Sequence, residues 1–377
     1  MMYQLSIIIG FKNREIIRIK RCLDSLNNQT NKNFQVLFID YGSDELISNQ
    51  ADEIVNSYSF CKYIFNNTRG RYWNRSHALN TGIKIAKSKY TMTTDIDMIF
   101  SENFIETIIN EVEENKILYT QCYWLPQFFD YKKTNYGNKY ELSSNTSGYG
   151  GCQIVESKDI KQVCGFDENF MIWGIEDEDL NVRFKRIGLK EKWLAIEKAQ
   201  IYHQWHPVVS HKNNKITPNG WYELMRNYYK NKDFDKTNND WGFLYSDEER
   251  PILNFINNNN IKNFNISFPK SNSFNEFVVL FNMLNKNECI KIAYEEPHKP
   301  SGKTTIGMKI IQNINSLFEK FNINQRIINH TINNPNYIKT SEVRDFLFYF
   351  ILNNKNEIED YYINYKEYSI EVFILKK

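Results

Sequence analysis

The stretch Thr93-Thr94-Asp95-Ile96-Asp97-Met98-Ile99-Phe100 decides the fold, because it joins an extended apolar run to a pair of acids. In an extended chain, side chains two residues apart point to the same face, so Asp95 and Asp97 are predicted to converge on one point. Two carboxylates that close are costly unless a proton or a cation neutralises one of them. Mg2+ and Mn2+ prefer such oxygen ligands and also bind substrate phosphates. A solvated turn with two acids is the simpler alternative, and the surrounding sequence has to decide between them.

Strand-like and helix-like segments alternate on the N-terminal side of these acids. Short apolar runs typical of buried strands lie at residues 5–9, 34–39, 62–65 and 90–94. Segments with a helical pattern lie between them, at residues 15–28, 45–57 and 75–87. This alternation predicts an α/β fold with a mostly parallel sheet flanked by helices. Ligands bind beyond the carboxyl ends of such strands, and Asp40 and Asp95 both lie at such ends.

The composition excludes several classes of protein. With 377 residues and 41% hydrophobic side chains, the chain can bury a sizeable core and is predicted to form two or three globular domains. A net charge of +2 gives no reason to expect a nucleic-acid partner. The six cysteines include no Cys-x-x-Cys pair, so they are interpreted as reduced core residues rather than as a zinc or redox site.

The hydrophobic runs also bear on location. Residues 1–14 have no basic start and only a short apolar run, so we expect no signal peptide. The longest late apolar run, residues 346–352, is far shorter than a membrane span. The prediction is therefore a cytoplasmic protein with, at most, peripheral contact at the inner face of the membrane.

Four consecutive acids, residues 176–179, open a helix-like segment further along the chain. Acids in the first turn of a helix favour its dipole, which is sufficient as a structural explanation. It does not explain the bulky Trp173 directly before Gly174 and the acids. A carboxylate beside an indole in a cleft is partly desolvated, and this raises its pKa and makes it a stronger base.

Two other features carry candidate functional groups. The glycines at residues 148–151 end a long polar loop, and they fit a plain turn and the close approach of a ligand equally well. His203 and His206 follow a short strand-like run. Single histidines are mostly structural, but two this close make a metal role for one of them reasonable.

Seven short segments, in order, resemble one family. Residues 21–29 and Asp40-Tyr41-Gly42-Ser43 resemble the opening of the inverting family 2 glycosyltransferases of the GT-A fold. The later segments are similar to the β-1,4-galactosyltransferase and chondroitin-polymerase type: Trp73-Asn74-Arg75 with Leu79-Asn80-Thr81-Gly82, Asp95-Ile96-Asp97, Gly150-Gly151, Trp173-Gly174-Ile175-Glu176-Asp177, and Tyr202-His203-Gln204. Tyr41 and Ile175 depart from the family pattern, which has Asp and Gly at these positions.

The resemblance implies a role for each matching residue. Asp97 would bind the metal, Mn2+ or Mg2+, with His203 as second ligand in preference to His206 and with Asp95 in the metal shell. Asp177 would be the general base. The residues expected to bind the nucleotide sugar are Asp40, Arg75, Asp95 and Gly151. Those expected to hold the acceptor sugar are Trp173 and Glu176.

The expected activity is the inverting transfer of Gal, GalNAc or GlcNAc from a UDP-sugar to a hydroxyl of a glycan or glycolipid acceptor, in surface polysaccharide synthesis. A non-catalytic module that binds nucleotide sugars or carbohydrate is the alternative, and only Tyr41 and Ile175 favour it. A metal-dependent nucleotidyltransferase is a weaker rival, because it gives the Trp-Gly-x-Glu-Asp segment no purpose.

The chain is predicted to divide into three parts. Residues 1–232 would form the GT-A catalytic domain, residues 233–268 a polar linker, and residues 269–377 a smaller α/β domain of unknown role. The patterns in this last part predict strands at 277–283, 289–294 and 370–375 and helices at 304–321 and 341–352.

Overall fold

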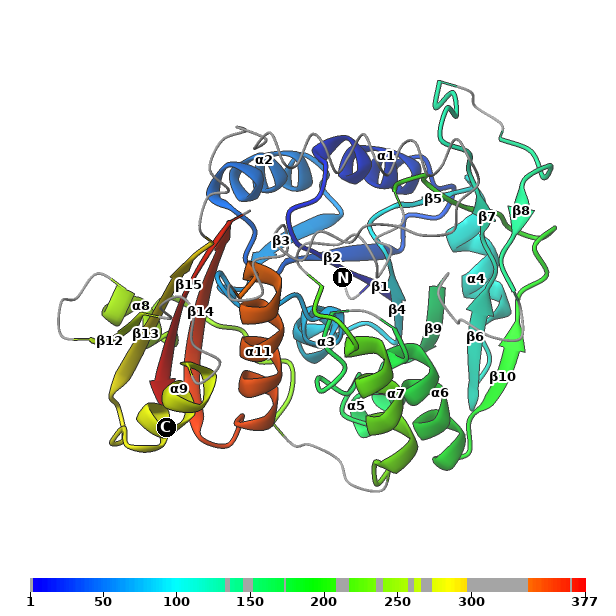
Figure 1. The fold of residues 1–377 in the computed structure, drawn as a ribbon. Helices are drawn as coiled ribbons and strands as arrows, with labels where there is room; N and C mark the ends of the chain where they lie inside the picture. The colour runs from blue at the N-terminus through cyan, green and yellow to red at the C-terminus, as the bar shows by residue number, and fades with distance from the viewer. Residues whose placement is uncertain are drawn as a thin grey trace, which may run out of the picture. The chain divides into compact units, whose positions relative to one another are not determined.

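The computed structural model describes residues 3–132, 136–144, 152–172, 174–207, 217–234, 240–256, 261–265, 273–296, 338–366 and 368–377. It divides the chain into two compact units, Met1–Pro251 and Ile252–Lys377. Figure 1 shows the first unit in blue to green and the second in yellow to red.

A seven-stranded sheet in the order β10-β6-β9-β4-β1-β2-β3 forms the centre of the first unit. The strands β1 (Leu5–Phe11), β2 (Phe34–Asp40), β3 (Cys61–Phe65) and β4 (Tyr90–Thr94) are parallel neighbours. A strand that the sequence patterns did not reveal, β9 (Cys152–Glu156), runs antiparallel between β4 and β6 (Lys116–Thr120), and β10 (Lys190–Trp193) pairs in parallel with β6. The predicted α/β class with a mostly parallel sheet is confirmed.

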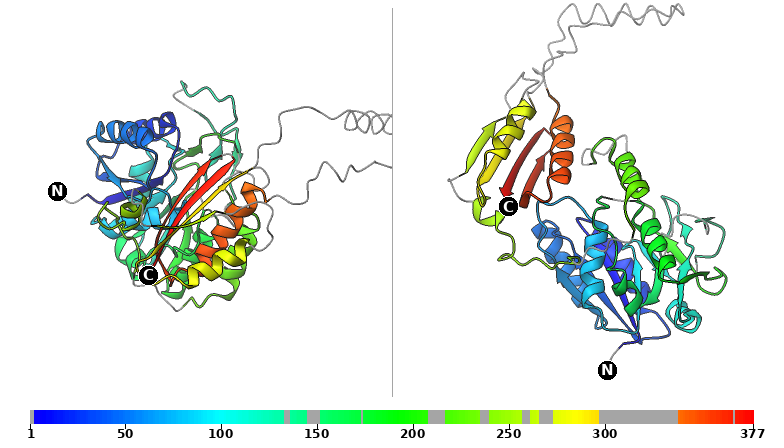
Figure 2. Two further views of the ribbon diagram at one scale, coloured as in Figure 1. Left: turned by 60° about the vertical axis from the view of Figure 1, so that its left-hand side comes forward. Right: turned by 90° about the horizontal axis from the view of Figure 1, so that it is seen from below.

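Helices cover both faces of this sheet because alternate strand residues point to opposite sides. Ile7 and Ile9 of β1 belong to the hydrophobic cluster under α1 (Ile16–Asn27), α2 (Glu45–Asn56) and α4 (Phe104–Glu111). Ile8 belongs to a second cluster, under α3 (Arg75–Ile85), α5 (Ser157–Gln162) and α6 (Glu176–Arg186). Figures 1 and 2 show the two sets of helices on either side of the strands. The sheet is therefore buried on both faces, which leaves the carboxyl ends of its strands for function.

A small second sheet stands at that edge. It contains β5 (Met98–Phe100), β11 (Ile201–His203), β7 (Tyr123–Trp124) and β8 (Glu141–Leu142), in that order. The strands β5 and β11 are antiparallel, with His203 opposite Met98. The second sheet therefore joins the segment after the two acids to the segment that carries the histidines.

Residues 240–250 differ from the predicted linker, because they pack on the first unit. The carbonyl of Phe243 accepts hydrogen bonds from Asn66 Nδ2 at 3.0 Å and from His77 Nε2 at 2.8 Å. The guanidinium of Arg250 is fully buried and donates to the carbonyl of Asn67 at 2.6 Å. Composition alone predicts a linker for a polar segment, but here the polar groups form hydrogen bonds with the rest of the first unit. The helix that precedes it, α7, covers Trp221–Asn231.

The second unit is built on a mixed sheet in the order β12-β13-β15-β14, with β12 at Lys262–Asn265, β13 at Cys289–Glu295, β15 at Ser369–Lys376 and β14 at Ile358–Lys366. Its described helices are α8 (Ile252–Ile256), α9 (Ser273–Asn282) and α11 (Thr340–Asn353). The predicted α/β character of this region is confirmed.

One predicted strand in this unit is wrong. The apolar run at 277–283 lies mostly in helix α9, where Phe277 and Phe281, four residues apart, are both buried. A short continuous apolar run fits a buried helix as well as a buried strand, and here the helical spacing of the two phenylalanines decides. Both rings pack against Phe350 of α11. The helix predicted at 304–321 lies outside the described residues.

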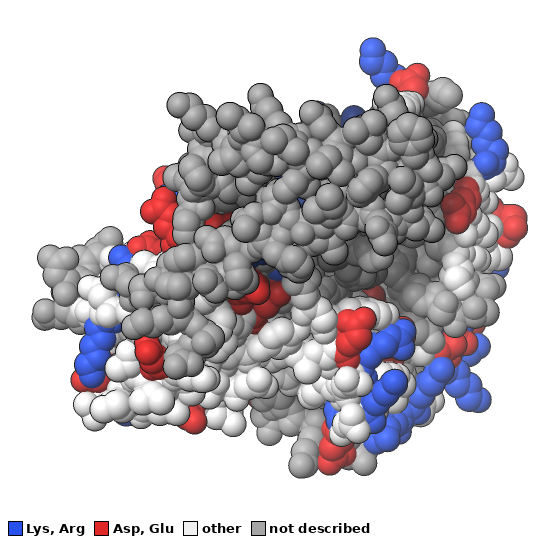
Figure 3. Space-filling view, viewed as in Figure 1, with Lys and Arg blue, Asp and Glu red and all other residues white. Residues whose placement is uncertain are grey.

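Other expectations concern the surface and the thiols. All six cysteines are free, and four of them are buried, as expected for reduced core residues. Among the described residues, no helix combines the length and the apolar character needed to cross a membrane. On the face displayed in Figure 3, basic and acidic side chains are interspersed over the described part.

Candidate functional site

Asp95 and Asp97 do not join one group of side chains, contrary to the prediction. The chain leaves β4 after Thr94 and turns through Ile96 and Asp97 before β5, so the extended geometry assumed for residues two apart does not apply. The carboxylate of Asp95 accepts from Arg75 Nε at 2.8 Å and is 37% exposed, whereas the side chain of Asp97 is 11% exposed and faces two histidines. The pair therefore divides between two neighbouring groups of residues.

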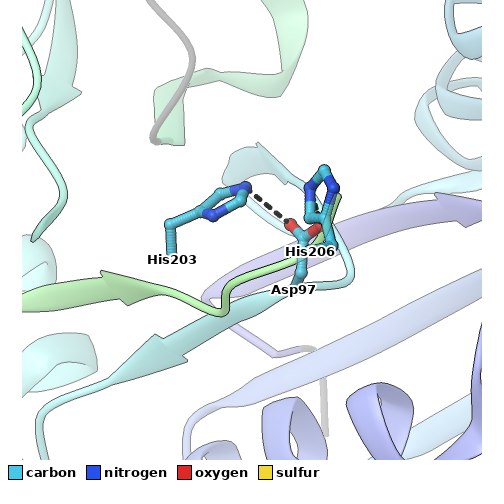
Figure 4. Close-up of side chains that lie close together, drawn as sticks. All are labelled: Asp97, His203 and His206. Atoms are coloured by element: carbon cyan, nitrogen blue, oxygen red, sulfur yellow. Dashed lines mark ion pairs between the residues drawn. The ribbon is translucent and has the colours of Figure 1, made fainter. Parts of the chain in front are cut away.

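The first group is the histidine corner, which consists of Asp97, His203 and His206. One ligand atom from each of the three lies within 4.8 Å of the others. His203 Nε2 is 3.6 Å from Asp97 Oδ1, and His206 Nε2 is 3.3 Å from Asp97 Oδ2. Figure 4 shows both imidazoles directed at this carboxylate. The sequence favoured His203 over His206, and the structure brings both together.

Strand pairing produces this arrangement. His203 is the last residue of β11 and stands opposite Met98, the first residue of β5. The N–H of Gln204 donates to the carbonyl of Asp97 at 2.8 Å and extends the pairing by one step. The ring of Trp124 on β7 packs 4.3 Å from the ring of His203, centroid to centroid. The backbone of the second sheet thus fixes the carboxylate and the first imidazole.

The histidine corner fits a divalent metal ion. Asp97 Oδ1 and His203 Nδ1 are buried without a hydrogen-bond partner among the described residues, where such atoms are normally paired. No lysine or arginine in the described part of the chain forms an ion pair with Asp97. One carboxylate and two imidazoles are a donor set suited to Mn2+ and similar ions.

The pKa shifts in the corner differ between the two histidines. Burial lowers the pKa of His203, which favours the neutral imidazole that binds metal. Burial alone would raise the pKa of Asp97, but the hydrogen bond from His206 and the charges of both histidines bring this pKa below its usual value. The hydrogen bond to Asp97 in turn raises the pKa of His206.

The second group is the arginine corner, which consists of Arg75, Asp95, Glu176 and Asp177. Arg75 is the first residue of α3, and Asn74 caps this helix by accepting from the N–H of His77. The buried guanidinium of Arg75 reaches Asp95, and its Nη1 lies 3.2 Å from Asp177 Oδ1 and 3.5 Å from Glu176 Oε1. One cation therefore joins the acid after β4 to the two acids that begin α6.

Burial makes these two acids stronger bases. Burial, followed by the charge of Asp177, raises the pKa of Glu176 to about 7. Burial also raises the pKa of Asp177, although Arg75 opposes this shift. A carboxylate with a raised pKa that is still 19% exposed can accept a proton from a bound molecule. The indole of Trp173, to which the sequence analysis attributed the desolvation of these carboxylates, lies outside the described residues.

Ile175, one of the two departures from the family pattern, lies in the turn before α6. Gly174 has φ of 95° and Ile175 has φ of 75°, both in the left-handed region. Glycine adopts this backbone freely, but a β-branched residue does so only under strain, of about 1–3 kcal/mol. The side chain of Ile175 is 6% exposed, so packing holds it in place. The strained turn sets where Glu176 and Asp177 begin the helix.

Asp40 lies at the end of β2, as predicted, but its carboxylate is fully buried. It accepts from the N–H of Ser43 at 2.8 Å, from Ser48 Oγ at 2.6 Å and from Tyr63 Oη at 2.6 Å. These contacts shape the loop after β2 from the inside. The second departure, Tyr41, is buried beside it, and its hydroxyl lies 3.0 Å from His77 Nδ1.

Two predicted site residues, Gly151 and Trp173, lie outside the described residues. One residue that the sequence did not single out joins the site: Gln153 of β9, whose Nε2 donates to Asp177 Oδ1 at 2.8 Å. Recognising β9 as a strand beside β4 would have placed Gln153 next to the rim. The five-residue segment Cys152–Glu156 contains two polar residues and gave no such signal.

Comparisons with known proteins cover the same part of the chain. Residues 6–152 match the family described as glycosyl transferase family 2, and residues 133–207 match the family described as N-terminal domain of galactosyltransferase. An uncharacterized glycosyltransferase of Rickettsia felis is 31% identical over 153 residues, which are 39% of this chain and 22% of that protein. Human chondroitin sulfate synthase 3 is 29% identical over 143 residues, 34% of this chain and 16% of that protein.

Solved structures also align with the chain. GalNAc-T7 with UDP, GalNAc and Mn2+ aligns with a TM-score of 0.46 and 14% identity, over 61% of this chain and 50% of that one. S. aureus TarS with UDP-GlcNAc aligns with a TM-score of 0.45 and 16% identity, over 59% and 64%.

The matched segment spans only about a fifth of the length of the first curated relatives, which are 20–22% covered. Within this chain, however, the two family matches overlap and run without a gap from residue 6 to residue 207. The first unit therefore matches both the family 2 glycosyltransferases and the galactosyltransferase domain. This confirms the resemblance predicted from its motifs.

Proposed function

We propose that the protein is an inverting, metal-dependent glycosyltransferase that moves a sugar from a UDP-sugar to a hydroxyl of a glycan or glycolipid acceptor. The observation that carries the proposal is the ion pair between Arg75 and Asp95, because the same guanidinium contacts Asp177. It ties Asp95, which follows β4, to the acids that begin α6. A donor side and a base side in register are what a displacement at a sugar carbon requires.

The chain's own residues would divide the work. Asp97, His203 and His206 would hold the metal ion, which when bound neutralises charge on the diphosphate. Asp177 would take the proton of the acceptor hydroxyl. The hydroxyl oxygen forms a bond to the anomeric carbon while the bond from that carbon to the diphosphate oxygen breaks. UDP leaves with the electron pair, and the new bond lies on the opposite face of the sugar.

The substrates follow from the resemblance. Gal, GalNAc and GlcNAc are the proposed sugars, and Mn2+ or Mg2+ is the proposed ion. A relative named chondroitin sulfate synthase supports a polysaccharide context. We place the reaction at the cytoplasmic side of the membrane, in surface polysaccharide synthesis. Catalysis is assigned to the first unit, and Gly151 and Trp173 keep their proposed contacts to donor and acceptor. Asp40, whose carboxylate is fully buried, would serve the donor site through the loop that it shapes.

A UDP-release screen of the full chain tests the proposal. Each of UDP-Gal, UDP-GalNAc and UDP-GlcNAc is incubated with Mn2+, Mg2+ or EDTA, with and without glycan acceptors. We expect release of UDP from one donor, dependent on the divalent ion and stimulated by an acceptor. Tight binding of a nucleotide sugar without any release would favour the binding-module alternative. Release of pyrophosphate instead of UDP would indicate a nucleotidyltransferase.

A further inference from the structure

Gln153 lies on an inner strand of the main sheet and contacts the arginine corner through Asp177. It lies on β9, opposite Thr93 of β4 on one side and Tyr119 of β6 on the other. The residue is buried, with 4% of its surface exposed. A glutamine at such a position has to be explained by what it binds, because a buried amide costs free energy unless it is hydrogen-bonded.

Among the described residues, its side chain bonds to the acid assigned as the base. Gln153 Nε2 donates to Asp177 Oδ1 at 2.8 Å, and Arg75 Nη1 reaches the same oxygen at 3.2 Å. Among the described residues, both hydrogen bonds to this carboxylate fall on Oδ1. The second oxygen, Oδ2, is therefore the one left for a ligand.

The chemistry of the donor matters as much as its position. Arg75 is shared among three carboxylates, whereas within the described part of the chain the amide of Gln153 donates to Asp177 alone. An amide fixes the carboxylate without adding a positive charge. A lysine or arginine in its place would lower the pKa of Asp177 and weaken it as a base. A neutral donor can orient a base and leave it basic.

The other end of the amide is also informative. Gln153 Oε1 is buried and has no hydrogen-bond partner among the described residues. The amide keeps its donor for Asp177, because with a proton on Oδ2 of that acid, Oδ1 is a carbonyl oxygen that still accepts from Nε2. Gln153 can therefore hold Asp177 before and after proton transfer.

We propose that Gln153 is a positioning residue that binds Asp177 through Oδ1 and thereby presents Oδ2 to the proton of the acceptor hydroxyl. The inference rests on the proposed function, since it concerns the base of that reaction. In the transfer step, the acceptor O–H proton moves to Asp177 Oδ2 as the oxygen bonds to the anomeric carbon and UDP departs. Gln153 itself exchanges no proton.

The substitution Gln153→Met tests this, because methionine has nearly the same volume and no N–H. We expect kcat to fall roughly 10- to 100-fold, the range for a lost hydrogen bond to a charged group. The Kd for UDP with Mn2+ should stay within twofold of wild type. Gln35→Met is the matched control, since Gln35 donates to Ser6 Oγ from β2, near the start of the strands.

The pH profile separates positioning from a structural role. The charged groups that face Asp177 are Arg75 of α3, Asp95 of the turn after β4 and its helix neighbour Glu176. All three remain in Gln153→Met, so only the lost donor changes. The pKa of Asp177 should rise, and the acid limb of kcat should move to higher pH. The near-isosteric Gln153→Glu keeps the volume should the methionine variant fold poorly, and its kcat at pH 7 should be at least as low.

The outcomes distinguish this inference from the function beneath it. If wild type releases UDP and either folded variant matches its kcat and pH profile, Gln153 has no positioning role. An equal loss in Gln35→Met, or a parallel loss of UDP affinity, also overturns the inference, because both indicate general damage. If wild type releases UDP from no donor, the proposed function fails and the role of Gln153 fails with it.

Discussion

The histidine corner and the arginine corner lie on either side of one short turn, yet they manage buried carboxylate charge in opposite ways. In the arginine corner, three acids share the internal cation Arg75, and Asp177 receives a second donor from Gln153. In the histidine corner, Asp97 faces two imidazoles, and Asp97 Oδ1 and His203 Nδ1 have no hydrogen-bond partner among the described residues. The arginine corner thus contains its own cation, whereas the histidine corner offers a donor set that fits an added one.

This difference assigns the two halves of the proposed reaction. A carboxylate held by fixed donors and raised in pKa is suited to proton transfer. A carboxylate that faces two imidazoles and has an unsatisfied oxygen is suited to binding a divalent ion. Substitutions in the arginine corner should therefore lower kcat, whereas substitutions in the histidine corner should weaken metal-dependent UDP binding.

Asp177→Asn should produce the largest effect. The amide keeps the shape and can still contact Gln153, but it cannot take the acceptor proton. We expect kcat for sugar transfer to fall by roughly 10^2 to 10^4, the usual worth of general base catalysis. The measurement is UDP release at saturating donor and acceptor.

Binding should be nearly unchanged in the same variant. Isothermal titration with UDP and Mn2+ should give a Kd within a few-fold of wild type, because the histidine corner is untouched. A variant that turns over at the wild-type rate would remove Asp177 as the base. A variant that loses both transfer and UDP binding would remove the functional separation of the corners.

Asp97→Ala should show the reverse pattern, with a smaller effect. We expect Mn2+-dependent UDP binding to weaken at least about tenfold, or ~1.4 kcal/mol, because the only carboxylate of the histidine corner is gone. UDP binding in EDTA should change little. His203→Ala and His206→Ala then show whether both imidazoles are ligands.

Asp95→Ala is the matched control, since it removes the neighbouring acid that binds Arg75. Its Mn2+ dependence should remain closer to that of wild type. An Asp97→Ala variant whose UDP affinity responds to Mn2+ as wild type does would show that the histidine corner holds no catalytic metal.

The same contrast shows what the sequence could and could not predict. Strands and helices of the first half follow from alternating patterns, so β1 to β4 and α1 to α3 agree with prediction to within a few residues. The predicted convergence of Asp95 and Asp97 is contradicted by a turn, and turn geometry over three residues has no periodic signal. The role of Gln153 depends on long-range strand order, which a local pattern does not contain.

The second unit gives the complementary lesson. Its run at 277–283 contains no polar residue between 277 and 281, so both a strand and a helix can bury it, and contacts with α11 select the helix. The packing of residues 240–250 was not predicted for a different reason. Their hydrogen bonds to the rest of the first unit involve backbone carbonyls, which no sequence motif marks.

Glu176→Gln should give the smallest effect, visible in the pH dependence of stability. Burial and the nearby Asp177 raise the pKa of Glu176 to about 7 in the folded protein, against an ordinary value of 4.5. The folded state therefore binds this proton more tightly than the unfolded state. Its contribution to stability is full below pH 4.5 and is lost as the pH rises through 7.

The glutamine variant carries no such proton, so its stability relative to wild type should increase between pH 5 and pH 8. One pKa unit corresponds to ~1.4 kcal/mol, and we expect at least this much. Urea unfolding in EDTA at several pH values measures it, and the exposed Glu53→Gln corrects for the loss of one charge. A stability difference that stays flat over this range would mean that Arg75 keeps Glu176 ionised, and the arginine corner would then hold three full negative charges instead of sharing one proton.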